Sequence, residues 1–561
     1  MSPSDRLAIG LDFGSGSVRA VVVDVRDGAI LGVAVAPYAN GKDGVLGSAE
    51  DPHIARQHPA DYIDGLLSSV RGAVAAAVAA GADPASIRGI GVDTTGSTPI
   101  PVDRRNIPLA FLPEWKDDLA AMAWMWKDHT AHAEAREICD RIKALGRPYL
   151  STCGGTYSSE WYWAKILRCE RAFPQVAAAA WSWVEFCDWI PAYLCGMTDP
   201  SAIPRGVCAA GHKALYHPSW GGLPDDAFFE SLQPGLSRFR ARFRQPAPPA
   251  DRPAGRLAPE VALKLGLSPE TVVAVGAFDA HLGAVGSGAG PGTLVKIIGT
   301  ACCDVTVLPL SRPLAEIPGV CGVVPESVLP GHHGIEAGQS AVGDLFNWFV
   351  SKFGHPGESQ GDTHRRLTRE ASASRPGASG LLTLDWHNGN RCILVDPRLT
   401  GLTLGQTLAT TPAEIYRSLI EATAFGARVI VERMEEYGVP IERVVCCGGI
   451  AEKNPVLMQI FADVLRRPLY VSRSDQTCAL GAAIMGAVAA GLHPDVATAQ
   501  TAMTGLKPGA VSPAPASAAV YDVLYGLYRR LHDAFGRGAV APLGDVMKVL
   551  LDVGEKARRS L

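Results

Sequence analysis

The stretch LAIGLDFGSGSVRAVVVD, residues 7–24, decides the fold that we predict. Its two apolar runs, Leu7–Asp12 and Val18–Val25, are typical of buried strands, and the small residues between them form a tight turn. Small residues let backbone N–H groups approach an anion, so the turn fits a phosphate cradle. The residues of that cradle would be Gly14, Ser15, Gly16 and Ser17. The carboxylate of Asp12 suits a Mg²⁺ ion held through waters, although a plain hairpin explains the motif equally well.

The second half of the chain contains a unit of the same form. The apolar runs Leu294–Ile298 and Ala301–Leu308 flank the pair Gly299 and Thr300. Alone, this pair is explained best as an ordinary turn. Two such hairpins at equivalent points of two halves predict a nucleotide held between two related lobes.

Strand and helix patterns alternate along the whole chain, which is typical of an α/β fold. We predict helices at Pro59–Ala80, Trp115–Leu145 and Asp475–Ala490, and strands at Ile87–Asp93 and Arg443–Cys447. A further helix begins after Thr411, because Thr411, Pro412 and Glu414 form an N-cap, a first-turn proline and a capping box.

The segment Gly283–Gly292 is rich in glycine and contains a proline, which is typical of a hinge or a domain boundary. We therefore predict two domains, residues 1–286 and 287–561, with the active site between them.

Composition excludes several classes of protein. The 561 residues are 47% hydrophobic and 19% charged, as in a globular chain, and the net charge of −4 argues against a nucleic-acid partner. No apolar run reaches the roughly 20 residues of a membrane span, and the segment ahead of Leu7 lacks the regions of a signal peptide. The 13 cysteines show no metal-binding spacing, so we expect reduced thiols in a cytoplasmic protein.

A glycine pair follows the strand predicted near the C-terminal end of the chain. Gly448 and Gly449 permit a flat adenine–ribose unit to lie against the backbone. Asn454 either contacts the nucleotide or caps the next helix, and capping is the simpler interpretation. The sequence has no G-x-x-x-x-G-K-[ST] motif, so the nucleotide site is not a P-loop.

Asp279 is the candidate general base. It follows a predicted strand just ahead of the hinge, and an Asp accepts the hydroxyl proton when a phosphoryl group moves to an alcohol. The alternative is that Asp279 caps the next helix. The segment that begins at Glu336 offers fixed hydrogen-bonding groups for a polyol, whereas Lys213 alone suggests only a solvated side chain, and Trp126 is explained equally well as a core residue.

Together, the hairpin pair, the glycine turn and Asp279 resemble the FGGY carbohydrate kinases. Further blocks between residues 7 and 490 match one branch of that family closely; these blocks are residues 91–99, 126–130, 158–161, 212–217, 278–281, 336–346, 385–391 and 448–455. The resemblance implies two actin-like (ribonuclease H-like) ATPase lobes with a central cleft, and ATP and Mg²⁺ as cofactors.

The resemblance also implies a role for each candidate residue. Asp279 would be the base, and Lys213 and Glu336 would bind the sugar, with Gly96 and Trp126 in the pocket wall. Asp12 would lie near Mg²⁺. The remaining positions would contact the phosphates and the adenosine, namely Gly14, Ser15, Gly16, Ser17, Gly299, Thr300, Gly448, Gly449 and Asn454.

The substrate that the resemblance implies is a ketopentose, L-ribulose, phosphorylated at its 5-position in L-arabinose catabolism; a homodimer is the family expectation. D-ribulose, xylulose and pentitols such as ribitol are the alternatives within the family. A non-catalytic actin-like sugar sensor is the alternative of another class. A repressor of that kind would need a helix-turn-helix before the first hairpin, and the sequence ahead of Leu7 has no room for one.

Overall fold

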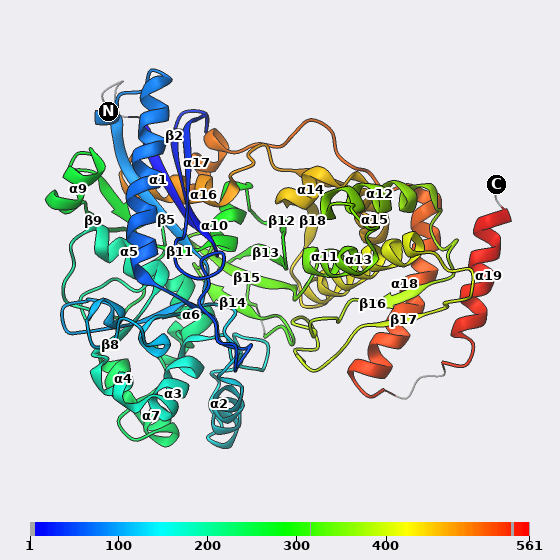
Figure 1. Cartoon of the computed structure of the whole chain (residues 1–561), viewed down its shortest axis with the longest axis horizontal. Helices are drawn as coiled ribbons and strands as arrows, with labels where there is room; N and C mark the ends of the chain where they lie inside the picture. Colours follow the sequence, from blue (N-terminus) through cyan, green and yellow to red (C-terminus); the bar gives the residue numbers. More distant parts are fainter. Residues whose placement is uncertain (1–5, 315, 540–542, 560–561) are drawn as a thin grey trace.

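The computed structural model describes residues 6–314, 316–539 and 543–559, and they form two lobes, each built on its own sheet (Figure 1). The first sheet has seven strands in the order β3-β2-β1-β5-β10-β9, with β11 paired to β5. Its strands are β1 (Leu7–Phe13), β2 (Ser17–Asp24), β3 (Ile30–Pro37), β5 (Ile87–Thr94), β9 (Pro253–Arg256), β10 (Val272–Ala274) and β11 (Ala277–Phe278).

The second sheet has six strands in the order β14-β15-β13-β12-β18-β19. Its strands are β12 (Gly292–Ile298), β13 (Cys302–Pro309), β14 (Gly322–Pro325), β15 (His332–Gln339), β18 (Ile441–Cys447) and β19 (Leu469–Val471). In each sheet a hairpin pairs with a later parallel strand: β1 joins β2 and β5 as β12 joins β13 and β18. This repeated arrangement confirms the predicted α/β fold of two related lobes.

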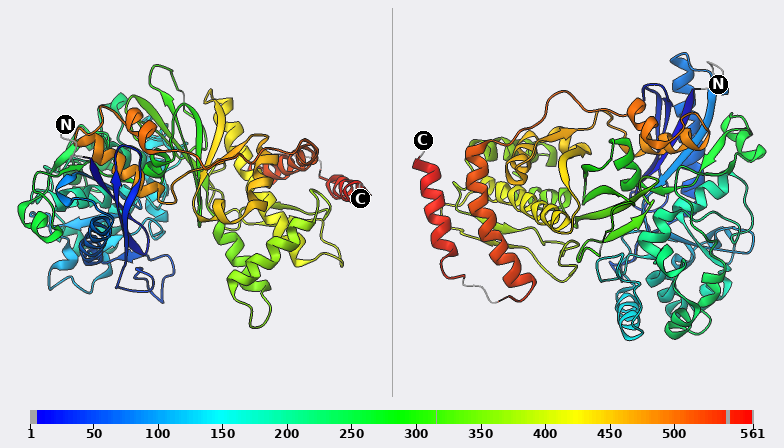
Figure 2. Two further views of the ribbon diagram at one scale, coloured as in Figure 1. Left: turned by 90° about the horizontal axis from the view of Figure 1, so that it is seen from above. Right: turned by 180° about the vertical axis from the view of Figure 1, so that it is seen from behind.

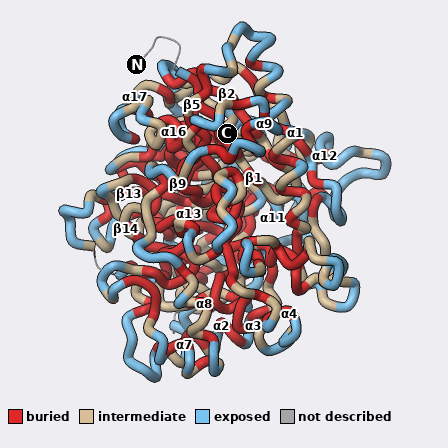
Figure 3. Tube along the Cα trace, turned by 90° about the vertical axis from the view of Figure 1, so that its left-hand side faces the viewer, coloured by how far each residue is buried: buried red, intermediate tan, exposed pale blue. Residues whose placement is uncertain are grey.

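The helices cover the sheets and build the outer parts of both lobes. Those of the first half are α1 (Pro59–Ala79), α2 (His132–Ala144), α3 (Tyr162–Ala172), α4 (Pro174–Ala179), α5 (Phe186–Leu194), α6 (Val207–Ala214), α7 (Asp226–Leu232), α8 (Ser237–Ala241), α9 (Pro259–Leu265) and α10 (Asp279–Gly286). Those of the second half are α11 (Gly343–Phe353), α12 (Gln360–Ala373), α13 (Pro412–Glu436), α14 (Gly449–Lys453), α15 (Pro455–Leu465), α16 (Thr477–Ala489), α17 (Val496–Met503), α18 (Pro515–Gly536) and α19 (Val546–Arg559). Buried residues fill the middle of the molecule (Figure 3).

The predicted helices at Pro59–Ala80 and Asp475–Ala490 are confirmed as α1 and α16, whose first and last residues differ slightly from the prediction. Thr411 and Glu414 form the expected capping box at the start of α13. Helix α1 is long and apolar enough to cross a membrane by length and composition, but its apolar side contacts β2 and β3, which is typical of a core helix.

The predicted helix at Trp115–Leu145 is wrong in its first half. Only α2 is α-helical there; before it the chain forms a short 3₁₀ helix at Leu119–Ala121 and then β7 (Ala123–Trp124), which pairs with β4 (Arg56–Gln57). Trp124 is fully buried, donates to the carbonyl of Ala120 at 2.9 Å, and lies under the guanidinium of Arg56. These tertiary contacts override the helical pattern of the local sequence. Two further short pairs complete the strands: β6 (Pro99–Val102) with β8 (Ser182–Glu185), and β16 (Leu382–Leu384) with β17 (Leu402–Leu404).

Helices α16 and α17 return from the second half to the first sheet (Figures 1 and 2). Helix α16 lies against β1 and β5 and against α10. Gly283 and Gly286, from the predicted hinge segment, are part of α10, where Gly286 approaches the backbone of Thr477. The boundary at residues 286 and 287 stays a prediction, and residues 477–503 lie against the first sheet although the prediction assigns them to the second domain.

Glycines make the approach of α16 to the sheet possible. A Cβ atom built on Gly91 would lie 1.8 Å from the carbonyl oxygen of Ala482, and one on Gly10 would lie 1.7 Å from that of Ala479. Backbone atoms cannot move aside as a flexible side chain does, so any larger residue at either position forces helix and sheet apart.

We therefore predict that Gly91→Ala lowers the free energy of unfolding by about 3 kcal/mol or more, the upper range for overpacked sites. Chemical denaturation followed by circular dichroism measures it. Gly290→Ala is the matched control, because a Cβ there meets nothing within 4 Å. Equal stability of the two variants would contradict the close contact between α16 and β5.

Candidate active site

Three carboxyl groups meet at the ends of neighbouring parallel strands in the first lobe. Asp12 of β1 lies beside Asp93 of β5 in the strand register. Phe278 of β11 lies beside Thr94, which places Asp279, the first residue of α10, next to them. The carboxyl ends of parallel strands share one edge of a sheet, the usual position of ligand sites in α/β proteins.

Electrostatics in this group favours a bound cation. Asp93 is fully buried, and within the described part of the chain neither of its carboxylate oxygens makes a hydrogen bond. Burial, followed by the negative charges of Asp12 and Asp279, raises the pKa of Asp93 well above its ordinary value. Burial also raises the pKa of Asp12, against the effect of Arg19, which donates to it at 2.9 Å.

Burial, and next the charge of Asp12, raises the pKa of Asp279 to about 7. Its Oδ1 accepts the backbone N–H of Ala280 at 2.7 Å, which fixes the carboxyl group at the start of α10. A carboxyl group with this pKa is poised to accept and release a proton near neutral pH. Asp279 is the first residue of α10 and not its N-cap, which is Phe278, so the capping alternative is wrong, whereas its electrostatics suit a base.

Asp93 is a candidate site residue that the sequence alone did not indicate, although it lies within the block at residues 91–99. Its role becomes visible only through the pairing of β5 with β1, which brings two carboxyl groups side by side. The buried carboxyl of Asp93, which no described residue hydrogen-bonds, and the partly buried carboxyl of Asp12 fit a hydrated divalent cation, since hard cations take oxygen ligands.

The first hairpin is held from outside by the side chains of two other segments. Its turn closes with a hydrogen bond from the N–H of Gly14 to the carbonyl of Ser17, 3.0 Å. The indole N–H of Trp126 donates to the hydroxyl of Ser15 at 3.0 Å, and the amide of Gln57 donates to its carbonyl at 2.8 Å. The half-buried Trp126 thus links the predicted phosphate turn, including Gly16, to the predicted sugar pocket.

In the second lobe, the hairpin turn and the glycine pair lie side by side. Gly448 has φ +96°, and a Cβ there would lie 2.5 Å from the carbonyl oxygen of Ile298, one residue before Gly299. The carbonyl of the exposed Thr300 accepts from the N–H groups of Val342 and Asp344, which ties the turn to the start of α11.

The surroundings of Gly449 and Asn454 differ. A Cβ on Gly449 would meet nothing within 4 Å, so this residue borders open space. The side chain of Asn454 accepts the N–H of Leu457 at 3.0 Å and caps α15. The capping interpretation is thus correct for that oxygen, and a contact of Asn454 with adenosine stays a prediction.

The N-terminus of α16 lies between the carboxyl groups of the first lobe and the strand end of the second. Burial, followed by the charges of Asp12, Asp93 and Asp279, raises the pKa of the Cys478 thiol well above its ordinary value, with a smaller contribution from Cys447. Cys447 precedes the glycine pair directly. The two halves of the predicted nucleotide site therefore adjoin each other across α16.

Lys213 and Glu336 form a buried ion pair across the lobes. Lys213 of α6 donates from Nζ to Glu336 of β15, at 3.2 Å to Oε2 and 3.4 Å to Oε1. Burial works against both charges, yet their attraction raises the pKa of Lys213 and lowers that of Glu336. Both charges also act on Asp279, so the three residues lie in one region as predicted.

Aromatic rings enclose this ion pair on the side of the first lobe. The ammonium of Lys213 lies 5.1 Å from the ring centre of Trp161 and 5.7 Å from that of Phe278, which precedes Asp279. A Cβ built on Gly96 would lie 1.8 Å from the ring of Phe278, so only glycine fits there. Gly96 is thereby next to the residue that precedes Asp279, and its place in the wall of a sugar pocket stays a prediction.

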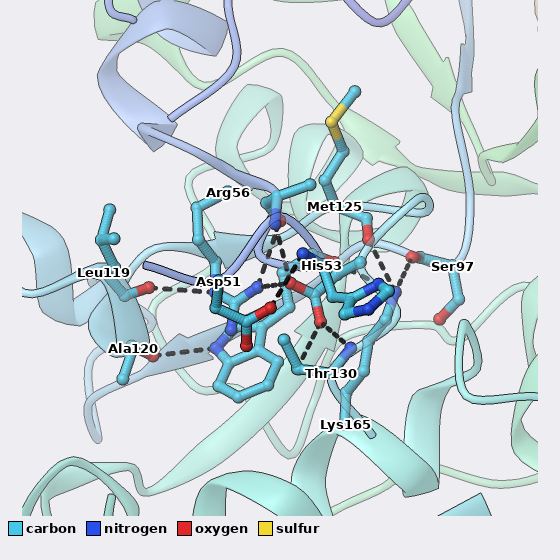
Figure 4. Close-up of polar contacts among 12 residues, drawn as sticks. Asp51, His53, Arg56, Ser97, Leu119, Ala120, Met125, Thr130 and Lys165 are labelled. Atoms are coloured by element: carbon cyan, nitrogen blue, oxygen red, sulfur yellow. Dashed lines mark hydrogen bonds and ion pairs between the residues drawn. The ribbon is translucent and has the colours of Figure 1, made fainter. Parts of the chain in front are cut away.

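A buried lysine that the sequence did not single out supports this wall (Figure 4). Lys165 of α3 donates to the carbonyls of Ser97 and Met125, each at 2.8 Å, and these residues neighbour Gly96 and Trp126. Glu185 holds the other side of the loop by accepting the hydroxyl of Ser97 at 2.6 Å. Burial lowers the pKa of Lys165 to about 8.

Comparison with known proteins finds relatives that cover almost the whole chain. Residues 294–490 match the FGGY family of carbohydrate kinases, C-terminal domain. The ribulokinase of Vibrio parahaemolyticus is 41% identical over 545 residues, which cover 93% of this chain and 95% of that protein. The ribulokinase of Mycolicibacterium smegmatis is 42% identical over 548 residues, 95% of this chain and 94% of that protein.

Solved structures agree on the fold. The xylulose kinase of Rhodospirillum rubrum superposes with a TM-score of 0.78 at 24% identity, covering 95% of this chain and 99% of that one. The glycerol kinase of Plasmodium falciparum gives 0.73 at 14% identity, covering 96% and 99%. The chain belongs to the FGGY family of carbohydrate kinases. Within that family it belongs to the ribulokinases.

We predict that Lys165→Met lowers the free energy of unfolding by about 2 kcal/mol or more, because it leaves buried carbonyls without a donor. Chemical denaturation measures the change. Lys143→Met is the matched control, since Lys143 is exposed on α2. If the two variants unfold at the same denaturant concentration, Lys165 does not hold the wall of the pocket.

Proposed function

We propose that the protein transfers the γ-phosphoryl group of Mg·ATP to the 5-hydroxyl of L-ribulose, a step of L-arabinose catabolism. One observation carries this proposal: the carboxyl of Asp279 shares its electrostatic environment with the buried pair of Lys213 and Glu336. A base beside fixed hydrogen-bonding groups is what phosphorylation of a polyol requires. The ribulokinase names of the full-length relatives support the choice of sugar.

The ketose would bind through its hydroxyl groups. The Lys213 ammonium can only donate hydrogen bonds, and the Glu336 carboxylate can only accept them. Lys213 would therefore bind a sugar hydroxyl at its lone pair, and Glu336 would bind one at its proton. Because the pair is buried, a sugar lacking a matching hydroxyl would leave charges unpaired and would bind weakly. Gly96 and Trp126 would form the wall against the carbon skeleton.

Asp279 would accept the proton of the acceptor hydroxyl as the oxygen attacks phosphorus. With a pKa near 7 in the protein without metal, the group is largely ionised under mildly alkaline conditions. The raised pKa also makes the carboxylate a stronger base than an exposed Asp.

The triphosphate would lie between the two hairpin turns, one in each lobe. Gly14, Ser15, Gly16 and Ser17 would face it from the first lobe, and Gly299 and Thr300 from the second. Gly448, Gly449 and Asn454 would border the adenosine. Asp12 and Asp93 would hold Mg²⁺ through waters, and the ion, when bound, offsets negative charge on the phosphates.

The cytoplasm is the compartment that we propose, since ATP is available there and all 13 cysteines are free thiols. A homodimer is proposed on the family resemblance alone.

The substrate is tested by a coupled ADP-release assay on a panel of L-ribulose, D-ribulose, xylulose, ribitol and glycerol. We expect the highest kcat/KM for L-ribulose, at least about tenfold above glycerol, since buried polar groups discriminate strongly against missing hydroxyls. A higher value for another pentulose would reassign the substrate, and ADP release without any sugar would favour a sensor or chaperone role.

We predict that Asp279→Asn folds normally but loses about 10²–10⁴-fold in kcat, the usual contribution of a positioned base. In the parent protein, kcat/KM for the ketose should fall as the pH drops below about 7, because protonation removes the base. Asp64→Asn, an exposed position on α1, is the control and should keep full turnover. Turnover of the Asp279→Asn variant within a few-fold of the parent would refute the assignment.

A further inference from the structure

Two buried histidines lie next to the Lys213–Glu336 ion pair, and the proposed function assigns no role to either of them. His212 of α6 and His281 of α10 belong to the first lobe, whereas Glu336 belongs to β15 of the second. His212 is 2% exposed and His281 is 1% exposed. Their position next to a sugar-binding carboxylate calls for a physical explanation.

The N–H groups around Glu336 converge on one oxygen. Oε2 lies 3.2 Å from Nζ of Lys213, 3.4 Å from Nδ1 of His212 and 3.7 Å from Nε2 of His281. Among the described residues, Oε1 accepts only from the ammonium of Lys213, at 3.4 Å. The two oxygens of this carboxylate therefore have different surroundings, one crowded by donors and one nearly free of them.

The carboxylate decides which ring nitrogens carry protons. A carboxylate only accepts, so it favours a hydrogen on the Nδ1 of His212 that faces it at 3.4 Å, although this Nδ1 makes no hydrogen bond within the described part of the chain. The Nε2 of His212 is then an acceptor, and it lies 3.1 Å from the Nε2 of His281, which must be the donor. The hydroxyl of Ser327, 3.0 Å from the same Nε2, can rotate to suit this arrangement. The two rings form a chain that ends on Oε2.

Both rings are neutral at physiological pH. Burial lowers the pKa of His281 to about 4, and burial together with His281 lowers that of His212 well below its ordinary value. A neutral ring supplies an N–H donor without adding a second cation beside Lys213. His212 thus faces Oε2 with a neutral N–H, His281 orients that ring, and Glu336 keeps its charge for the ligand.

A metal ion is the rival explanation, since His212, His281 and Glu336 offer ligand atoms within 4.8 Å of one another. However, the ammonium of Lys213 already lies 3.2 Å from the carboxylate oxygen that the ion would need. A divalent cation there would face a buried positive charge at close range, which is strongly unfavourable. Hydrogen bonding is therefore the better explanation of the cluster.

We propose that His212 and His281 are positioning residues that hold Oε2 of Glu336 across the lobe boundary and so leave Oε1 free for a hydroxyl group of the ketose. This inference rests on the proposed function, because it assigns Glu336 to the sugar. It predicts that the histidines control the affinity for the sugar and not the chemical step or the binding of ATP.

The test compares two substitutions of His281. His281→Leu removes the donor, whereas His281→Gln places an amide N–H close to the position of Nε2. For the Leu variant we expect KM for L-ribulose to rise about 3- to 10-fold, because the bond it loses is the neutral one that orients the ring of His212 toward Glu336. Its KM for ATP and its kcat should stay within about threefold, and the Gln variant should recover most of the loss. His212→Asn against His212→Leu repeats the comparison at Nδ1.

His532→Gln is the matched control, because His532 is equally buried at 1% exposure but lies on α18, where it contacts Asp533. It should leave KM for the ketose unchanged even if the melting temperature falls. Thermal unfolding of each variant, with and without ATP, shows whether the fold and the nucleotide site are intact.

Three results would overturn the inference. The Leu and Gln variants could have equal KM values, KM for ATP could rise as much as KM for the ketose, or Zn²⁺ could bind the parent protein in calorimetry and lose that binding in the Gln variant. Failure of the proposed function has a different signature, since the parent protein itself would then not phosphorylate L-ribulose.

Discussion

The mutual repulsion of three carboxyl groups at one sheet edge is the constraint on which the site depends. Parallel strand pairing brings Asp12, Asp93 and Asp279 together. It is a backbone interaction, so it does not depend on the charge of these side chains. Folding thus stores an electrostatic cost at the point where β1, β5 and β11 end, and a cation relieves it. Burial, and after it the charge of Asp12, raises the pKa of Asp279, so the proposed base and the proposed metal site share the same electrostatic surroundings.

Helix α16 joins this edge to the second lobe. It can lie directly on β1 and β5 only because glycines such as Gly91 leave room for its backbone. Its N-terminus lies beside the carboxyl groups and beside the end of β18, which leads into the glycine pair. A contact between glycines and a helix backbone therefore sets how the two halves of the proposed nucleotide site adjoin. The ion pair of Lys213 and Glu336 joins the lobes where we propose that the sugar binds.

Much of this arrangement could be predicted from local sequence. Both hairpins and the capping box of α13 depend on neighbouring residues, and the structure contains them as expected. Features that depend on distant contacts could not be predicted. The carboxyl of Asp93 can be recognised as part of the site only when strand pairing places it beside Asp12. Lys165 can be recognised only from the hydrogen bonds that it donates to carbonyls of two separate loops. The helix expected at Trp115–Leu145 fails for the same reason, because Trp124 is extended to contact Arg56.

The central claim is that Asp279 takes the proton from the sugar. A crystal structure with L-ribulose, Mg²⁺ and a non-hydrolysable ATP analogue tests it most directly. The account predicts a carboxylate oxygen of Asp279 about 2.6–3.2 Å from the 5-hydroxyl oxygen, with that hydroxyl facing the γ-phosphorus. A carboxylate turned away from the acceptor, with another side chain or no base in its place, would contradict the account.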